Sequence, residues 1–152
     1  VLGCPYQGKV PVDMVVNLAA QMSEMGCSEI SLGDTIGIGT PLEAKNMMES
    51  VAEKVPLSNL ALHFHDTRGQ ALANIYACLE LGITVFDASV SGLGGCPYAK
   101  GAAGNVATEE VVYMLHGMGI ETGIDLEKLI ETGRFISDAF GRMPQSRVSS
   151  AL

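Results

Sequence analysis

The sequence predicts an α/β fold in which parallel strands alternate with helices. Short apolar segments typical of buried strands recur along the 152 residues, and a longer segment with helical periodicity follows each of them. The strand-like segments are Val1–Leu2, Glu29–Leu32, Leu60–His65 and Val85–Val90. Parallel strands need a crossover that spans the face of the sheet, and a helix usually provides it, so this repetition favours a parallel sheet.

Five helices are expected from their start and stop signals. The first starts near Pro11 and stops at Gly26, because proline fits the first helical turn and glycine commonly ends a helix. The second opens on the capping box that Thr40 and Glu43 form, and it ends before Pro56. The other three run from about Gly69 to Leu81, from Thr108 onward, and from Asp125 to about Gly141.

Helical spacing also predicts which side chains two of these helices bury. For the first helix they are Met14, Val15, Leu18, Met22 and Met25. For the last helix they are Leu126, Leu129, Ile130, Ile136 and Phe140.

The length of these units predicts half of a (β/α)8 barrel. One strand-and-helix unit takes about 30 residues, as in a barrel of roughly 250 residues and eight units. Four units are too few to close such a barrel. We therefore expect residues 1–141 to form a partial barrel with about four parallel strands, flanking helices and an extra terminal helix. Residues 142–152 are expected to form a polar tail that frays.

Composition excludes several classes of function. An apolar fraction of 47% supports a buried core, and a net charge of −8 is the wrong sign for binding nucleic acid through its phosphates. Apolar stretches break before the roughly 20 residues that a membrane helix needs. The sequence lacks a secretory leader pattern, and its four cysteines are irregularly spaced, which favours a reduced compartment. We expect neither a nucleic acid nor a membrane partner.

Two histidines end the third predicted strand. His63 and His65 are two residues apart, so both face the same side about 6.8 Å apart, while Phe64 packs against the helices. The spacing leaves two alternatives, a metal site or two hydrogen-bonded histidines in a polar cavity. Asp66 faces the other way and is expected to cap the next turn.

Three further candidates lie after predicted strands. Cys96, in the glycine-rich segment 91–105, is a candidate proton donor on a mobile loop or a cysteine without a role. Asn105 offers an amide oxygen to a hard cation or caps the following helix. Asp34 is a candidate acid or base, or the start of an Asx turn that opens the loop at Gly37–Gly39.

These motifs together resemble the 3-hydroxy-3-methylglutaryl-CoA (HMG-CoA) lyase family. The segment Ser89–Tyr98 is similar to the family's signature around its active-site cysteine, and Leu32–Gly37 and His65–Thr67 support the resemblance. It implies the carboxy-terminal half of a TIM barrel, from the fifth to the eighth strand. It also implies cleavage of the small-molecule substrate HMG-CoA to acetyl-CoA and acetoacetate, in the bacterial cytoplasm or the mitochondrial matrix, by a homodimer when full length.

The resemblance further implies roles for individual residues. His63, His65 and Asn105 would bind a divalent metal, Mg²⁺ or Mn²⁺. Cys96 would be the catalytic thiol, with His63 and Asp34 assisting proton transfer. The Arg-Asp pair on the family's first strand has no counterpart in these 152 residues, which leaves the activity of the chain alone open. The alternatives are a related metal-dependent Claisen-type synthase, such as an isopropylmalate or homocitrate synthase, and a non-catalytic half barrel.

Overall fold

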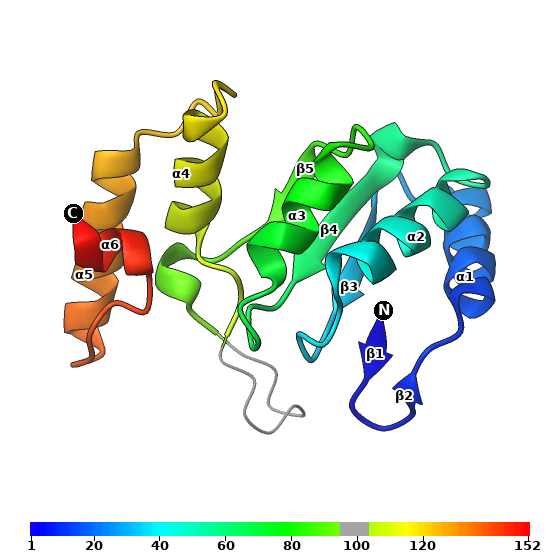
Figure 1. Ribbon diagram of the computed structural model, residues 1–152, viewed down its shortest axis with the longest axis horizontal. Coiled ribbons are helices and arrows are strands. Elements are labelled where there is room, and N and C mark those ends of the chain that lie inside the picture. Colours follow the sequence, from blue (N-terminus) through cyan, green and yellow to red (C-terminus); the bar gives the residue numbers. More distant parts are fainter. Residues whose placement is uncertain (95–103) are drawn as a thin grey trace. The chain divides into compact units, whose positions relative to one another are not determined.

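The computed structural model describes residues 1–94 and 104–152. The chain forms two compact units, of which the first is Val1–Asp87 and the second comprises residues 88–94 and Gly104–Leu152 (Figure 1). The first unit contains a parallel sheet, and the second is mainly helical. Within the described residues, no helix has the length and apolar character that a membrane span requires.

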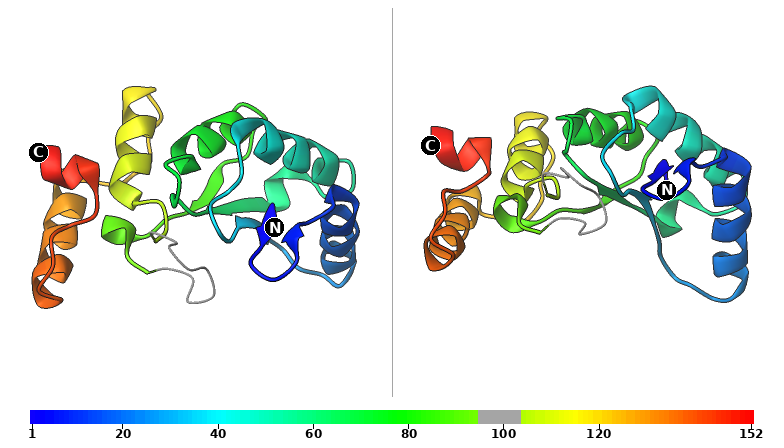
Figure 2. Two further views of the ribbon diagram at one scale, coloured as in Figure 1. Left: turned by 60° about the horizontal axis from the view of Figure 1, so that its bottom comes forward. Right: turned by 90° about the horizontal axis from the view of Figure 1, so that it is seen from below.

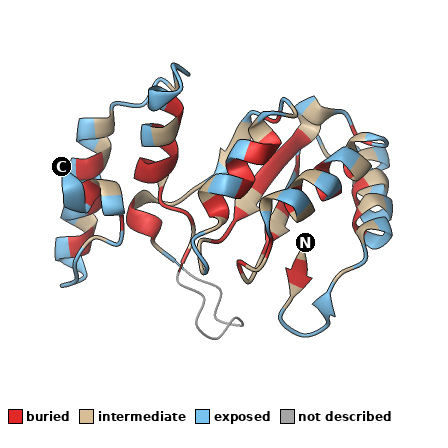
Figure 3. Cartoon of the chain, in the orientation of Figure 1, coloured by how far each residue is buried: buried red, intermediate tan, exposed pale blue. Residues whose placement is uncertain are grey.

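A three-stranded parallel sheet forms the centre of the first unit. Its strands are β3 (Ile30–Asp34), β4 (Leu60–Phe64) and β5 (Val85–Asp87), with β4 between the other two. All residues of β4 except His63 are buried (Figure 3). The parallel pairing of the three strands confirms the predicted α/β fold. Burial of the central strand is typical of such sheets.

Three helices connect and cover these strands. They are α1 (Val12–Glu24), α2 (Pro41–Ala52) and α3 (Ala71–Leu79). Helices α2 and α3 pack against each other on one face of the sheet (Figure 2). The predicted capping box starts α2, where Glu43 Oε2 accepts hydrogen bonds from the backbone N–H of Thr40 at 3.1 Å and from its hydroxyl at 3.0 Å. A 3₁₀ turn, η1 (Leu57–Asn59), leads into β4.

The start of the chain differs from the sequence prediction. Val1–Leu2 is not a strand of the sheet, although the Leu2 N–H donates to the Gly33 carbonyl at 3.0 Å. Instead β1 (Gly3–Cys4) and β2 (Gly8–Lys9) pair as a short antiparallel hairpin. Gly8 has a φ of 73°, which lets the chain turn back on itself before it reaches α1.

The second unit begins with a turn where the sequence predicts strand. Strand β5 ends at Asp87, and a 3₁₀ turn, η2 (Val90–Gly92), replaces the last part of the predicted segment. Ser91 has a φ of 55°, which is incompatible with a strand. Within this unit, Ser89 and Ala107 form an isolated parallel bridge.

Helices α4 (Thr108–Gly117) and α5 (Leu126–Ala139) agree closely with the sequence prediction, but the expected frayed tail contains a short helix, α6 (Arg147–Ala151). The Ser146 hydroxyl caps α6 by accepting from the Ser149 N–H at 3.0 Å. The Arg147 N–H donates to Glu110 of α4 at 2.6 Å. These polar contacts order a segment that its composition alone marks as irregular.

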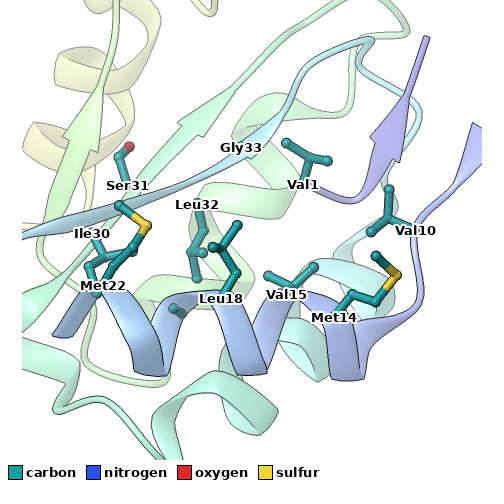
Figure 4. A pocket seen from close by; sticks show the side chains of 11 residues that line it. Val1, Val10, Met14, Val15, Leu18, Met22, Ile30, Ser31, Leu32 and Gly33 are labelled. Atoms are coloured by element: carbon teal, nitrogen blue, oxygen red, sulfur yellow. The ribbon is translucent and has the colours of Figure 1, made fainter. Parts of the chain in front are cut away.

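An apolar surface on α1 is the largest departure from the predicted burial. Met14 and Leu18 are each 59% exposed and Met25 is 83% exposed, whereas the predicted burial of Val15 is correct. On α5, Phe140 is likewise exposed. We define the α1 surface as Met14, Leu18 and the neighbouring Val1, Val10, Met22 and Ile30, which line a pocket of about 280 Å³ (Figure 4). The helical spacing is right, but no described residue covers this face.

We expect the α1 surface to make the 152-residue chain self-associate, because exposed contiguous apolar surface favours association. Replacing both Met14 and Leu18 by Lys should shift the chain toward monomer in sedimentation velocity. Phe135→Lys, which removes an exposed aromatic side chain from α5, is the control and should leave association unchanged. A monodisperse monomer for the unsubstituted chain would contradict this expectation.

Candidate metal and proton-transfer site

The register of the sheet places two polar side chains, those of His63 and Asp87, side by side in what we call the polar row. His63 on β4 is paired with Asp87 on β5 and, on its other side, with Gly33 on β3. Because side chains alternate along a strand, Leu62 and Phe64 point to the opposite face, where each is 1% exposed. His63 and Asp87 therefore project from the face that the apolar core leaves free.

The two histidines lie close together. The rings of His63 and His65 have centroids 5.2 Å apart and meet edge to face, as the two-residue spacing predicts. Across residues 1–94 and 104–152, no group of three or more His, Cys, Asp or Glu side chains is arranged to hold a metal ion. The pair brings together two candidate ligand nitrogens, and its role in metal binding stays a prediction.

His65 is held in its neutral state. It is 6% exposed, and its Nδ1 lies 3.0 Å from the Asp34 carbonyl oxygen. A carbonyl only accepts hydrogen bonds, so Nδ1 carries the proton and the lone pair is on Nε2. Burial lowers the pKa of His65, and the neighbouring His63 lowers it further. Both effects favour the neutral imidazole that metal ligation requires.

Asp34 holds the loop that follows β3. Its side chain is fully buried, and its two carboxylate oxygens accept hydrogen bonds from the backbone N–H groups of Ile38 at 3.1 Å and Gly39 at 2.8 Å. This arrangement agrees with the turn-forming alternative for Asp34. Its role in proton transfer stays a prediction.

Asn105 presents an unused oxygen within the second unit. Its Nδ2 donates to the Leu93 carbonyl at 3.0 Å, while its Oδ1 is buried and has no hydrogen-bond partner among the described residues. A buried polar atom without a partner costs about 1–3 kcal/mol, so such atoms commonly mark ligand sites. Asn105 does not cap α4, because Ala107 occupies the N-cap position. Asn105 belongs to the second unit and the two histidines to the first, so the ligand set of His63, His65 and Asn105 stays a prediction.

Two predicted residues remain, Asp66 and Cys96. Asp66 Oδ1 accepts from the Ala71 N–H at 3.0 Å and so pairs the first N–H of α3, although Gln70 is the N-cap residue. Cys96 lies outside the described residues.

Sequence reasoning missed two acidic residues. Asp87 Oδ2 accepts from the Ser31 hydroxyl at 2.8 Å and lies 3.4 Å from His63 Nδ1. Glu109 is fully buried and accepts from the Ser91 N–H through both oxygens, at 3.0 and 2.9 Å; burial raises its pKa. The strand register is the signal that would have identified Asp87. No such signal exists for Glu109. It lies in the first turn of a helix, where acidic residues are common because they interact favourably with the helix dipole.

The lowered pKa of His65 predicts a pH-dependent stability. Below the usual histidine pKa of about 6.5, the unfolded chain takes up a proton that folded His65 resists, so the free energy of unfolding should fall as the pH drops from 7 toward 5. His65→Gln should flatten this dependence in urea denaturation. His116→Gln, at an exposed histidine, is the control. If the free energy of unfolding of His65→Gln depends on pH as it does in the unsubstituted chain, the expectation is refuted.

Comparison with known proteins places these features in a family. The chain is 58% identical over 151 residues to the mitochondrial hydroxymethylglutaryl-CoA lyase of Gallus gallus. This match covers 99% of the chain and 51% of the relative. It is 55% identical over 150 residues to the cytoplasmic 3-hydroxy-3-methylglutaryl-CoA lyase of Rattus norvegicus, covering 99% of this chain and 44% of the relative. The chain therefore spans about half the length of the curated relatives it matches.

Solved structures give the same result. A hydroxymethylglutaryl-CoA lyase from Pseudomonas aeruginosa matches with a TM-score of 0.95 and 55% identity, over 99% of this chain and 50% of that one. An HMG-CoA lyase from Acinetobacter baumannii, solved with coenzyme A and 3-methylmalate, matches with a TM-score of 0.93 and 39% identity, over 99% and 49%. These matches confirm that the chain folds as part of an α/β barrel. Residues 1–136 match the family model described as HMGL-like, and the chain belongs to that family.

Proposed function

We propose that the protein containing this chain is an HMG-CoA lyase that cleaves HMG-CoA to acetyl-CoA and acetoacetate. The observation that carries the proposal is the 55–58% identity, over 99% of the chain, to relatives that bear this name. The structural relative solved with coenzyme A supports a small acyl-CoA as substrate. Relatives occur in mitochondrial and cytoplasmic forms, and either compartment suits this function. The Claisen-type synthase is not favoured, because these relatives are lyases.

We propose that His63, His65 and Asn105 bind the metal, Mg²⁺ or Mn²⁺. The neutral state of His65 supports this assignment, and so does the buried Oδ1 of Asn105, which has no hydrogen-bond partner among residues 1–94 and 104–152. A bound divalent cation supplies Lewis-acid polarisation of the substrate's oxygens. The fixed Nδ1 proton of His65 directs its free Nε2 lone pair away from the Asp34 carbonyl.

The reaction requires two proton movements. One proton leaves the 3-hydroxyl group, and one reaches the enolate carbon of the departing acetyl-CoA. We assign assistance of the first to His63, whose ring is half-exposed on the polar row, and the second to the Cys96 thiol as general acid. Asp34 is also proposed to take part in proton transfer, and its carboxylate holds the loop at Ile38 and Gly39.

Metal binding provides the first test. In the complete protein, His63→Ala and His65→Ala should each weaken Mn²⁺ binding in calorimetry by more than the roughly 10–100-fold that loss of an outer partner causes. His116→Ala is the matched control, because this histidine lies on α4 and contacts Thr122 instead. Equal Mn²⁺ affinity in all three variants would reject the assigned ligands.

The catalytic thiol provides the second test. Cys96→Ala should lower kcat for acetoacetate release by roughly 10²–10⁴ while leaving Mn²⁺ binding intact, because the thiol donates a proton and is not a ligand. Cys4→Ala is the control, since Cys4 has the same Gly-Cys-Pro-Tyr context on the hairpin. Unchanged rates in Cys96→Ala would remove the assignment, and condensation of acetyl-CoA with a 2-oxo acid would indicate a synthase.

A further inference from the structure

A carboxylate–histidine pair lies within the polar row. We propose that Asp87 is a positioning residue that holds His63 with its proton on Nδ1, so that Nε2 presents its lone pair to the metal. The inference rests on the proposed metal site and adds to it a residue that none of the sequence motifs contains.

The geometry of the pair follows from strand register. Asp87 is paired with His63 across β4 and β5, and its Oδ2 lies 3.4 Å from His63 Nδ1. Both side chains are a little less than half exposed, at 43% for His63 and 46% for Asp87. An ionised carboxylate only accepts hydrogen bonds, so the contact is favourable when Nδ1 carries the proton. The remaining nitrogen, Nε2, is then free to bind a cation.

Ser31 fixes the orientation of the Asp87 carboxylate. The Ser31 hydroxyl on β3 donates to Asp87 Oδ2 on β5 at 2.8 Å, across the intervening strand β4. At that level of the sheet β4 carries Ala61, which is paired with both Ser31 and Val85. The short alanine side chain leaves room for the hydrogen bond. One serine thus anchors the carboxylate that faces His63.

The two histidines have the same support from different acceptors. The Asp34 carbonyl accepts from Nδ1 of His65, and the Asp87 carboxylate faces Nδ1 of His63. Partners of this kind set the tautomer and the ring orientation of histidine ligands.

The tautomer of His63 is the direct test. In the complete, metal-free protein, side-chain ¹⁵N NMR should show the Nδ1–H tautomer for both histidines at neutral pH. Asp87→Ala should convert His63 to the Nε2–H tautomer and leave His65 unchanged, because a backbone carbonyl holds His65. His65 thereby reports that the variant is folded. Ser31→Ala should shift His63 in the same direction by a smaller fraction.

Metal affinity separates this inference from the proposed site. Asp87→Ala should weaken Mn²⁺ binding about 10–100-fold, whereas Asp13→Ala, which removes an exposed carboxylate on α1, should not. If His63→Ala weakens Mn²⁺ binding but Asp87→Ala does not, the positioning role is wrong and the metal site stands. If His63→Ala has no effect, the metal site is wrong. Retention of the Nδ1–H tautomer in Asp87→Ala would overturn the inference in either case.

Discussion

The parallel register of β3, β4 and β5 is the constraint on which the site depends. It places His63 beside Asp87 and, because side chains alternate, it sends Leu62 and Phe64 into the core. A slip of one residue would expose Phe64 and bury His63. Full burial of each large apolar side chain is worth about 1.5–3 kcal/mol, so the apolar face determines the register. The polar row is a consequence of how the core packs.

Buried carboxylates determine the loops that follow the strands in both units. Asp34 holds the backbone of the loop after β3, and Glu109 holds Ser91 at a φ of 55°. Gly133 has no side chain beside Glu109, where an added Cβ would come within 2.5 Å of a carboxylate oxygen. Removing a carboxylate from water is costly, and hydrogen bonds from backbone N–H groups offset that cost. Each loop backbone thus adopts the conformation that its buried carboxylate requires.

Local patterns in the sequence predicted the parts of the fold that depend on local physics. The alternation of strands and helices, the capping box at Thr40 and the convergence of His63 and His65 all follow from spacing within a few residues. The pairing of Ser31 with Asp87 is 56 residues apart in sequence, and it becomes visible only when the register is known. The η2 turn and the α6 helix likewise depend on distant acids. Burial on α1 could not be predicted, because periodicity identifies an apolar face without showing what covers it.

The charge of the proposed ligand set shows which kind of ligand it lacks. Two neutral imidazoles and one amide oxygen leave the double positive charge of a cation uncompensated, and hard cations prefer anionic oxygen ligands. Asp87 lies behind His63, where it offsets part of this charge through the ring without itself facing the lone pair on Nε2. An anionic oxygen is therefore the kind of ligand that this proposed set of three lacks.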